Sequence, residues 1–193
     1  MQVNAAARPH DGEPAARRHG LAAAAPLPDE RAAALVERLP IAPGRHVLAL
    51  GGGANELLLR ILARRPATTG TAVALDREAQ AWGRRRAVER GLQERVDFVE
   101  ADVRELEDRG DIVLCVGAAH AWGGIGATLA ALRERVERGG LVLFGEGLRT
   151  NASGQEELVA VAERSGFRVL SAERSRSDEQ DGFAWLVLTP RDP

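Results

Sequence analysis

Residues 46–55 read HVLALGGGAN, an apolar run followed by three consecutive glycines. A short run that is apolar throughout is typical of a strand covered on both faces of a sheet. Glycines after such a strand let the backbone turn tightly and let a ligand lie against bare main chain. A helix is predicted at residues 55–64, with apolar positions at Leu58, Leu59, Ile61 and Leu62. The stretch therefore predicts a strand, a glycine turn and a helix in succession.

Outward from this stretch, strand and helix patterns alternate over the rest of the chain. Further strands are predicted at residues 71–75, 96–100, 111–116, 141–144, 167–170 and 183–188. Further helices are predicted at residues 29–39, 78–90, 127–136 and 155–165. Gly139 and Gly140 are expected to end the helix at 127–136. Regular alternation of this kind predicts an α/β fold with helices on both faces of a mostly parallel sheet.

The last two predicted strands depart from this alternation, because no helix pattern separates them. They are expected to form a hairpin at one edge of the sheet, which requires the last strand to run antiparallel. The charged run between them, ERSRSDEQD at residues 173–181, is interpreted as a solvated hairpin loop. The predicted fold is Rossmann-like and doubly wound, with seven strands and an antiparallel last strand.

A single domain accounts for most of the chain. Its 193 residues suffice for one domain with a sizeable core. Residues 1–28 are rich in Ala, Arg, Pro and Gly without a clear period. We interpret them as a flexible N-terminal arm that either stays disordered or orders over the site when ligand binds. Residues 29–193 then form the domain, and His10 and His19 belong to the arm.

Composition narrows the function classes. The net charge is −2, which argues against a nucleic-acid-binding protein, and all 26 basic residues are arginines, so no lysine chemistry is available. Cys115 is the only cysteine and cannot form an internal disulfide, so a reducing cytoplasm is expected. No apolar run approaches the roughly 20 residues that cross a bilayer, so no membrane association is expected.

Polar residues with chemical potential fall directly after the predicted strands. Ligands of an open α/β sheet bind beyond the carboxyl ends of its strands, where strand order reverses. Asp76 follows the second strand and can accept hydrogen bonds from both ribose hydroxyls, or can cap the next helix. Asp102 follows the third strand and can accept from an adenine amino group, or can form an Asx turn. A glycine turn followed by these two acids suits one adenosine ligand.

Together these segments resemble the class I S-adenosylmethionine-dependent methyltransferases over residues 29–190. HVLALGGGANELLL resembles the family's first motif, AVALD its acidic second-strand end, and FVEADV its adenine-contacting segment. DIVLCVGAAHAWGG and LRERVERGGLVLFGEG resemble its fourth strand and the passage into its fifth. The resemblance implies S-adenosylmethionine as cofactor and S-adenosylhomocysteine as product. It implies cofactor binding by Leu50, Gly51, Gly52, Gly53, Asn55, Asp76, Arg77, Asp102, Val103, Cys115 and Gly117.

Two positions depart from the family's first motif. Ala49 stands where the family has an acid that commonly helps to anchor the amino-acid end of the cofactor. Asn55 stands at the third glycine position, and Asn tolerates a left-handed backbone better than most residues. Glu56 is a candidate replacement for the acid, and it equally suits the first turn of a helix.

Methyl transfer in this family is an in-line displacement, for which the protein must hold donor and acceptor close and aligned. His120, after the fourth strand, is the candidate general base; the alternative is that it orients substrate or packs on Trp122. Glu146, after the fifth strand, is the second candidate catalytic residue; its alternative is a hydrogen bond to loop backbone. No cysteine and histidine cluster has metal-ligand spacing, so no metal is expected.

The leading function hypothesis is methyl transfer to a small-molecule acceptor. A non-methylating enzyme such as a cyclase, or a non-catalytic partner subunit, remains open because of Ala49 and Asn55. An NAD-dependent dehydrogenase is disfavoured, since Glu56 stands where that fingerprint has its third glycine or alanine. The short segment 149–154 leaves three arrangements: an open site, a site completed by the N-terminal arm, or a site completed by the second subunit of a homodimer.

Overall fold

The computed structural model describes residues 29–52, 55–148, 154–175 and 182–191. The predictions for the N-terminal arm, for Gly53 and for most of segment 149–154 lie outside these residues. Within the described part of the chain, no helix is both long and apolar enough to cross a membrane.

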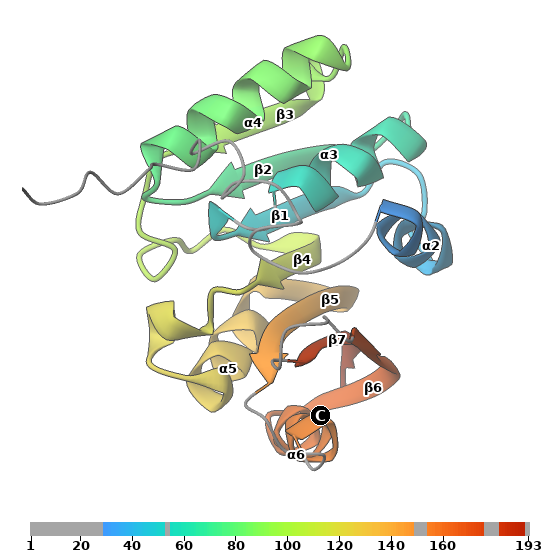
Figure 1. Cartoon of the computed structure of the whole chain (residues 1–193), viewed down its shortest axis with the longest axis vertical. Coiled ribbons are helices and arrows are strands. Elements are labelled where there is room, and N and C mark those ends of the chain that lie inside the picture. The colour runs from blue at the N-terminus through green and yellow to red at the C-terminus, as the bar shows by residue number, and fades with distance from the viewer. Residues whose placement is uncertain (1–28, 53–54, 149–153, 176–181, 192–193) are drawn as a thin grey trace, which may run out of the picture.

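One seven-stranded sheet organises the fold, in the order β3-β2-β1-β4-β5-β7-β6. Figure 1 shows it running from β3, beside α4, to β6, beside α6. The five strands β3, β2, β1, β4 and β5 run parallel to one another, and β7 is antiparallel to both β5 and β6. The strands are β1 (His46–Leu50), β2 (Thr69–Val73), β3 (Val96–Val99), β4 (Gly110–Val116), β5 (Val136–Leu148), β6 (Phe167–Ser175) and β7 (Gly182–Pro190).

Helices cover both faces of the sheet, as the alternation predicts. The helices are α2 (Asp29–Arg38), α3 (Asn55–Arg64), α4 (Arg77–Glu89), α5 (Ile125–Arg135) and α6 (Gly154–Arg164), with short 3₁₀ turns η3 (Gln93–Arg95) and η4 (Ala119–Trp122). Val47 and Ala49 of β1 face a core shared with α2 and α3, whereas Leu48 and Leu50 face a core shared with α5 and α6. Because both faces of β1 are buried, its sequence is apolar without alternation.

The carboxyl end of β2 lies two residues earlier than the sequence predicts. The expected strand at 71–75 is β2 at Thr69–Val73, because its partner β1 ends at Leu50, which is paired with Val73. The next amide, of Ala74, instead donates to the carbonyl oxygen of Val99 on β3 at 3.2 Å. Ala74 and Leu75 are therefore loop residues beyond the carboxyl end of β2, not strand residues.

The expected role of the glycine pair after α5 is wrong. The helix ends at Arg135, and β5 begins at once at Val136, so Gly139 and Gly140 lie inside the strand. A Cβ atom at Gly140 would lie 2.5 Å from the carbonyl oxygen of Asp111 on β4. The register of the β4–β5 pair shifts in this region, so Gly140 allows two backbones to approach closely.

The hairpin at the end of the chain is confirmed, with longer strands than predicted. Residues 173–175, expected in the charged loop, belong to β6, where Glu173 pairs with Trp185. Residues 176–181 lie outside the described residues. The returning strand β7 inserts between β5 and β6, so β6 forms the edge. Cross-strand pairing with the apolar β7 extends β6 beyond what its own charged sequence indicates.

Replacing Gly140 with Ala is expected to destabilise the protein by about 1–3 kcal/mol, because the added methyl group must displace backbone. Urea denaturation measures the free energy of unfolding. Gly126→Ala is the matched control, since Gly126 lies in the exposed part of α5 and its Cβ would meet only Val161, at 3.9 Å. Equal stability of the two variants would show that the β4–β5 approach does not require glycine.

Candidate functional site

A cavity of about 550 Å³ opens at the carboxyl ends of the central strands. The strands β2 and β3 lie on one side of β1, and β4 lies on its other side. The order of the strands therefore reverses at β1. Ligands of doubly wound sheets bind at this point. Seven of the residues predicted for the site line the cavity: Gly51, Gly52, Asp76, Asp102, Val103, Gly117 and His120.

Other lining residues were not predicted from the sequence. They are Ala74, Leu75, Ala79, Arg104, Val116, Ala118 and Ala121. Most are small and apolar, and a small apolar side chain carries no chemical signal in a sequence. Arg104 is the exception, because its position two residues after Asp102 could have indicated a charged partner for that carboxylate.

The glycine turn packs against the loops around it. Gly51 has φ +88°, and its amide donates to the carbonyl oxygen of Val73 at 2.8 Å. A Cβ atom on Gly51 would lie 2.8 Å from the Cβ of Ala118, and one on Gly52 would lie 3.1 Å from the Cβ of Ala79. The turn therefore leaves bare main chain along the cavity, and side chains there would fill its floor.

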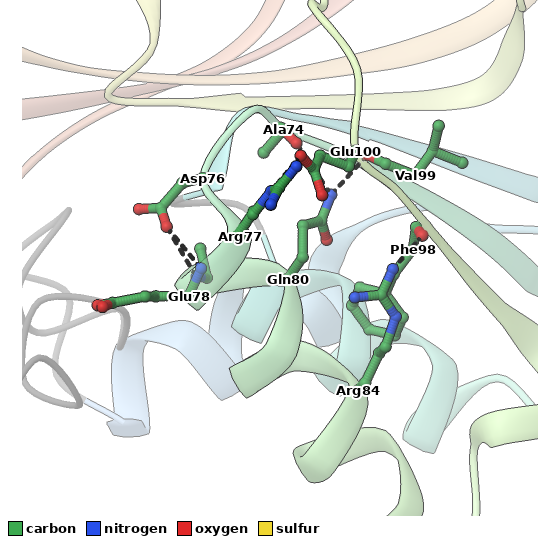
Figure 2. A network of polar contacts seen from close by, with 10 residues as sticks. Ala74, Asp76, Arg77, Glu78, Gln80, Arg84, Phe98, Val99 and Glu100 are labelled. Atoms are coloured by element: carbon green, nitrogen blue, oxygen red, sulfur yellow. Dashed lines mark hydrogen bonds and ion pairs between the residues drawn. The ribbon is translucent and has the colours of Figure 1, made fainter.

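Asp76 fulfils its alternative role as helix cap and also lines the cavity. Its Oδ1 accepts hydrogen bonds from the amides of Glu78 at 2.9 Å and Ala79 at 3.0 Å, as Figure 2 shows. These bonds satisfy free amides of the first turn of α4. The cap fixes the carboxylate at the carboxyl end of β2, beside the glycine turn.

Gln80 joins the ends of two strands beneath the cavity, a role that the sequence did not indicate. Its side chain is buried, and Nε2 donates to the carbonyl oxygens of Val99 at 2.7 Å, Ala72 at 3.1 Å and Ala74 at 3.4 Å. Figure 2 shows Gln80 directed toward the ends of the two strands, where Ala74 and Val99 lie. Arg84 of the same helix donates to the carbonyl oxygen of Phe98 at 2.7 Å. These contacts join α4 to the carboxyl ends of both β2 and β3.

Arg77 lies outside the cavity lining. Its Nε donates to Oε1 of Glu100 at 2.5 Å, and its side chain is 83% exposed. Figure 2 shows the guanidinium directed toward Glu100, which follows β3. In this structure Arg77 therefore bridges α4 and the end of β3 at the surface.

Asp102 forms a two-pronged ion pair with Arg104. Oδ1 accepts from the Arg104 backbone amide at 2.9 Å and from Nε at 3.0 Å. Oδ2 accepts from Nη2 at 2.6 Å and from Nε at 3.1 Å. The side-chain hydrogen bond from Arg104, followed by the backbone bond, lowers the pKa of Asp102 to about 2. Asp102 is thus both an Asx-turn residue and a carboxylate that stays ionised at neutral pH.

The two candidate catalytic residues have different surroundings. His120 lies on η4 after β4, is exposed, and lines the cavity. Glu146 does not line the cavity; its Oε2 accepts from the amide of Ala119 at 3.1 Å and its Oε1 from that of Gly147 at 3.2 Å. Glu146 therefore supports the loop that carries His120, which matches the alternative role expected for it.

Two further predicted cofactor residues, Leu50 and Cys115, are fully buried in the core beneath the site. Burial, followed by the charge of Glu146, raises the pKa of the Cys115 thiol to about 12. Neither side chain lines the cavity. Cys115 therefore packs as a small apolar residue of β4.

The positions that depart from the first motif are buried on the α2 and α3 side. Ala49 is fully buried, and Nδ2 of the Asn55 side chain donates to the carbonyl oxygen of Ala79 at 3.3 Å. Glu56 accepts from Arg60 at 2.9 Å and from Arg90 at 2.8 Å, and lines a separate cavity of about 240 Å³. Glu56 therefore does not replace the missing acid at the candidate site.

A second groove, of about 630 Å³, adjoins the cavity at Arg104, His120 and Ala121, which line both. Trp122 lines only this groove. Trp82 lies on α4, with the guanidinium of Arg86 5.9 Å from its ring centre, and lines neither space. Among the described residues, no group of three or more His, Cys, Asp and Glu side chains could hold a metal ion.

No protein-family profile matches the chain. Over 150 aligned residues it is 32% identical to the uncharacterized protein YjhP of Escherichia coli strain K12. The aligned region covers 75% of this chain and 60% of YjhP. The chain therefore spans less than two thirds of the length of this relative.

Solved structures share the architecture. The X-ray structure of Escherichia coli YjhP has a TM-score of 0.75 at 22% identity, covering 87% of this chain and 95% of that one. A SAM-dependent methyltransferase from Geobacter sulfurreducens, in complex with S-adenosyl-L-homocysteine, has a TM-score of 0.75 at 22% identity. The match covers 86% of this chain and 92% of that one. The [4+2]-cyclase SpnF has a TM-score of 0.66 at 20% identity, and the match covers 84% of this chain and 81% of that one. The chain thus has the fold of the class I S-adenosylmethionine-dependent methyltransferases.

Proposed function

We propose that the cavity binds S-adenosylmethionine and that the protein transfers its methyl group to a small-molecule acceptor. One observation carries the proposal: a glycine turn, Asp76 and Asp102 line one cavity at the reversal of strand order. The methyltransferase of Geobacter sulfurreducens, which has the same fold, was crystallised with S-adenosyl-L-homocysteine. The volume of about 550 Å³ lies within the range of small-molecule sites.

The residues present fit the adenosine part of this cofactor. A side chain at Gly51 or Gly52 would fill the cradle, so these positions favour a ligand that lies against main chain. Asp76 would accept from the ribose hydroxyls, and Asp102 with the amide of Val103 would bind the adenine edge. When bound, the cofactor supplies an electrophilic methyl group.

The amino-acid end of the cofactor has fewer partners. Ala49 offers no carboxylate, and Glu56 is held by Arg60 and Arg90 in a different cavity. Recognition therefore depends mainly on the adenosine end. This predicts similar affinities for S-adenosylhomocysteine and for 5′-methylthioadenosine, which has the adenosine end but lacks the amino-acid end.

His120 is the residue proposed to accept a proton from the acceptor. Its side chain lies at the junction of the cavity and the second groove, where an acceptor could meet the cofactor. The hydrogen bond that the Ala119 amide donates to the Glu146 carboxylate holds the loop that carries His120. The groove, with Trp122 and Arg104 in its lining, has a volume within the range of small-molecule sites.

A non-methylating enzyme is the second candidate function. The loss of the acid at Ala49 favours it, because a scaffold role needs cofactor binding without a precisely held methyl group. The [4+2]-cyclase SpnF, with the same fold, supports the possibility of other chemistry. Binding of S-adenosylmethionine without turnover over a broad acceptor panel would favour this candidate.

Calorimetric titration is expected to give micromolar affinity for S-adenosylhomocysteine, and Asp76→Asn is expected to weaken it about tenfold, because a charged acceptor for the ribose is lost. Asn is as good a helix cap as Asp, so the melting temperature should stay unchanged. Asp76→Ala, which removes both the cap and the acceptor, is expected to lower affinity and melting temperature together. Wild-type protein that binds neither S-adenosylmethionine nor S-adenosylhomocysteine would refute the proposed function.

Turnover is tested with methyl-labelled S-adenosylmethionine and a panel of small phenols, amines and carboxylic acids. For an acceptor that carries a proton, His120→Gln is expected to lower kcat about a hundredfold, because the general base is lost. The affinity for S-adenosylhomocysteine should not change. A variant with the wild-type kcat would show that His120 only orients the acceptor or lines the groove.

A further inference from the structure

The carboxylate proposed to bind adenine already accepts hydrogen bonds from Arg104. Asp102 is 15% exposed, and both of its oxygens accept hydrogen bonds from Arg104. Oδ1 receives the backbone amide and Nε, while Oδ2 receives Nη2 and shares Nε. A carboxylate offers about four lone-pair positions. Arg104 fills these positions with three N–H groups, so an adenine amino group must compete with the guanidinium for the acceptor capacity of Asp102.

The side chain of Arg104 is placed to leave Asp102 without disturbing the backbone. It is 62% exposed, and it lies at the boundary between the cavity and the second groove. The carbonyl oxygen of Arg104 accepts from Nη2 of Arg135 at 3.2 Å, which fixes the loop. Glu134 lines the same groove.

We propose that Arg104 is a specificity-determining residue that competes with the adenine amino group for Asp102. The inference rests on the proposed function, because it requires that the base binds beside Asp102. Arg104 weakens recognition of a 6-amino purine. It favours a 6-oxo purine, whose carbonyl oxygen can accept from the guanidinium that a free carboxylate would repel.

The test compares two ligands that differ only at this purine position, S-adenosylhomocysteine and S-inosylhomocysteine. Arg104→Gln is expected to bind S-adenosylhomocysteine about threefold more tightly than wild type, as the loss of an exposed ion-pair competitor implies. The same variant is expected to bind S-inosylhomocysteine more weakly. Arg104→Lys keeps the charge without the two-pronged geometry. Its affinity for each ligand should lie between those of wild type and Arg104→Gln.

Arg138→Gln is the matched control, because it makes the same charge change at an exposed position near the start of β5, outside both lining sets. It should change neither affinity. A purely structural role of Arg104 would shift both affinities in the same direction and lower the melting temperature, and this outcome would overturn the inference.

The remaining outcomes separate the inference from the function on which it rests. Wild-type binding of S-adenosylhomocysteine that weakens in Arg104→Gln would overturn the competition and make Arg104 a direct ligand. Absence of binding of S-adenosylhomocysteine by wild type and variant alike would overturn both the proposed function and the inference.

Discussion

The burial of β1 between two parallel neighbours is the constraint on which the rest of the structure depends. Both faces of the strand carry core residues, so its end is fixed at Leu50 by pairing with β2 and β4. The chain leaves β1 toward β2 on one side while β4 occupies the other. The two loops that follow β1 and β4 therefore diverge, and the cavity lies between them.

The polar residues of the site also stabilise the scaffold. Asp76 caps α4, Asp102 closes a turn with Arg104, and Gln80 joins β2 to β3. Each of these contacts fixes a strand end at which a ligand would bind. A site built in this way is held in position before ligand arrives, because the same bonds that fold the loops orient the carboxylates.

Departures from the family's first motif affect one end of the candidate site. Ala49 and Asn55 are buried on the side of the sheet that packs against α2 and α3, whereas the carboxylates of Asp76 and Asp102 line the cavity. Glu56 is committed to an ion-pair cluster between helices. Under the proposed function, the cavity therefore offers carboxylates to the adenosine end of the cofactor and fewer partners to its amino-acid end.

The sequence by itself determined the fold class, the bounds of β1 and α3, and the terminal hairpin, because apolar periodicity and glycine act locally. It also placed Asp76 and Asp102 at the same sheet edge. Only the tertiary structure decided where β2 ends, that Gly140 lies against the backbone of β4, and that Arg104 forms an ion pair with Asp102. These features depend on which backbone or side chain lies opposite in space, and residues far apart along the chain, or free to rotate within a loop, leave no periodic signal.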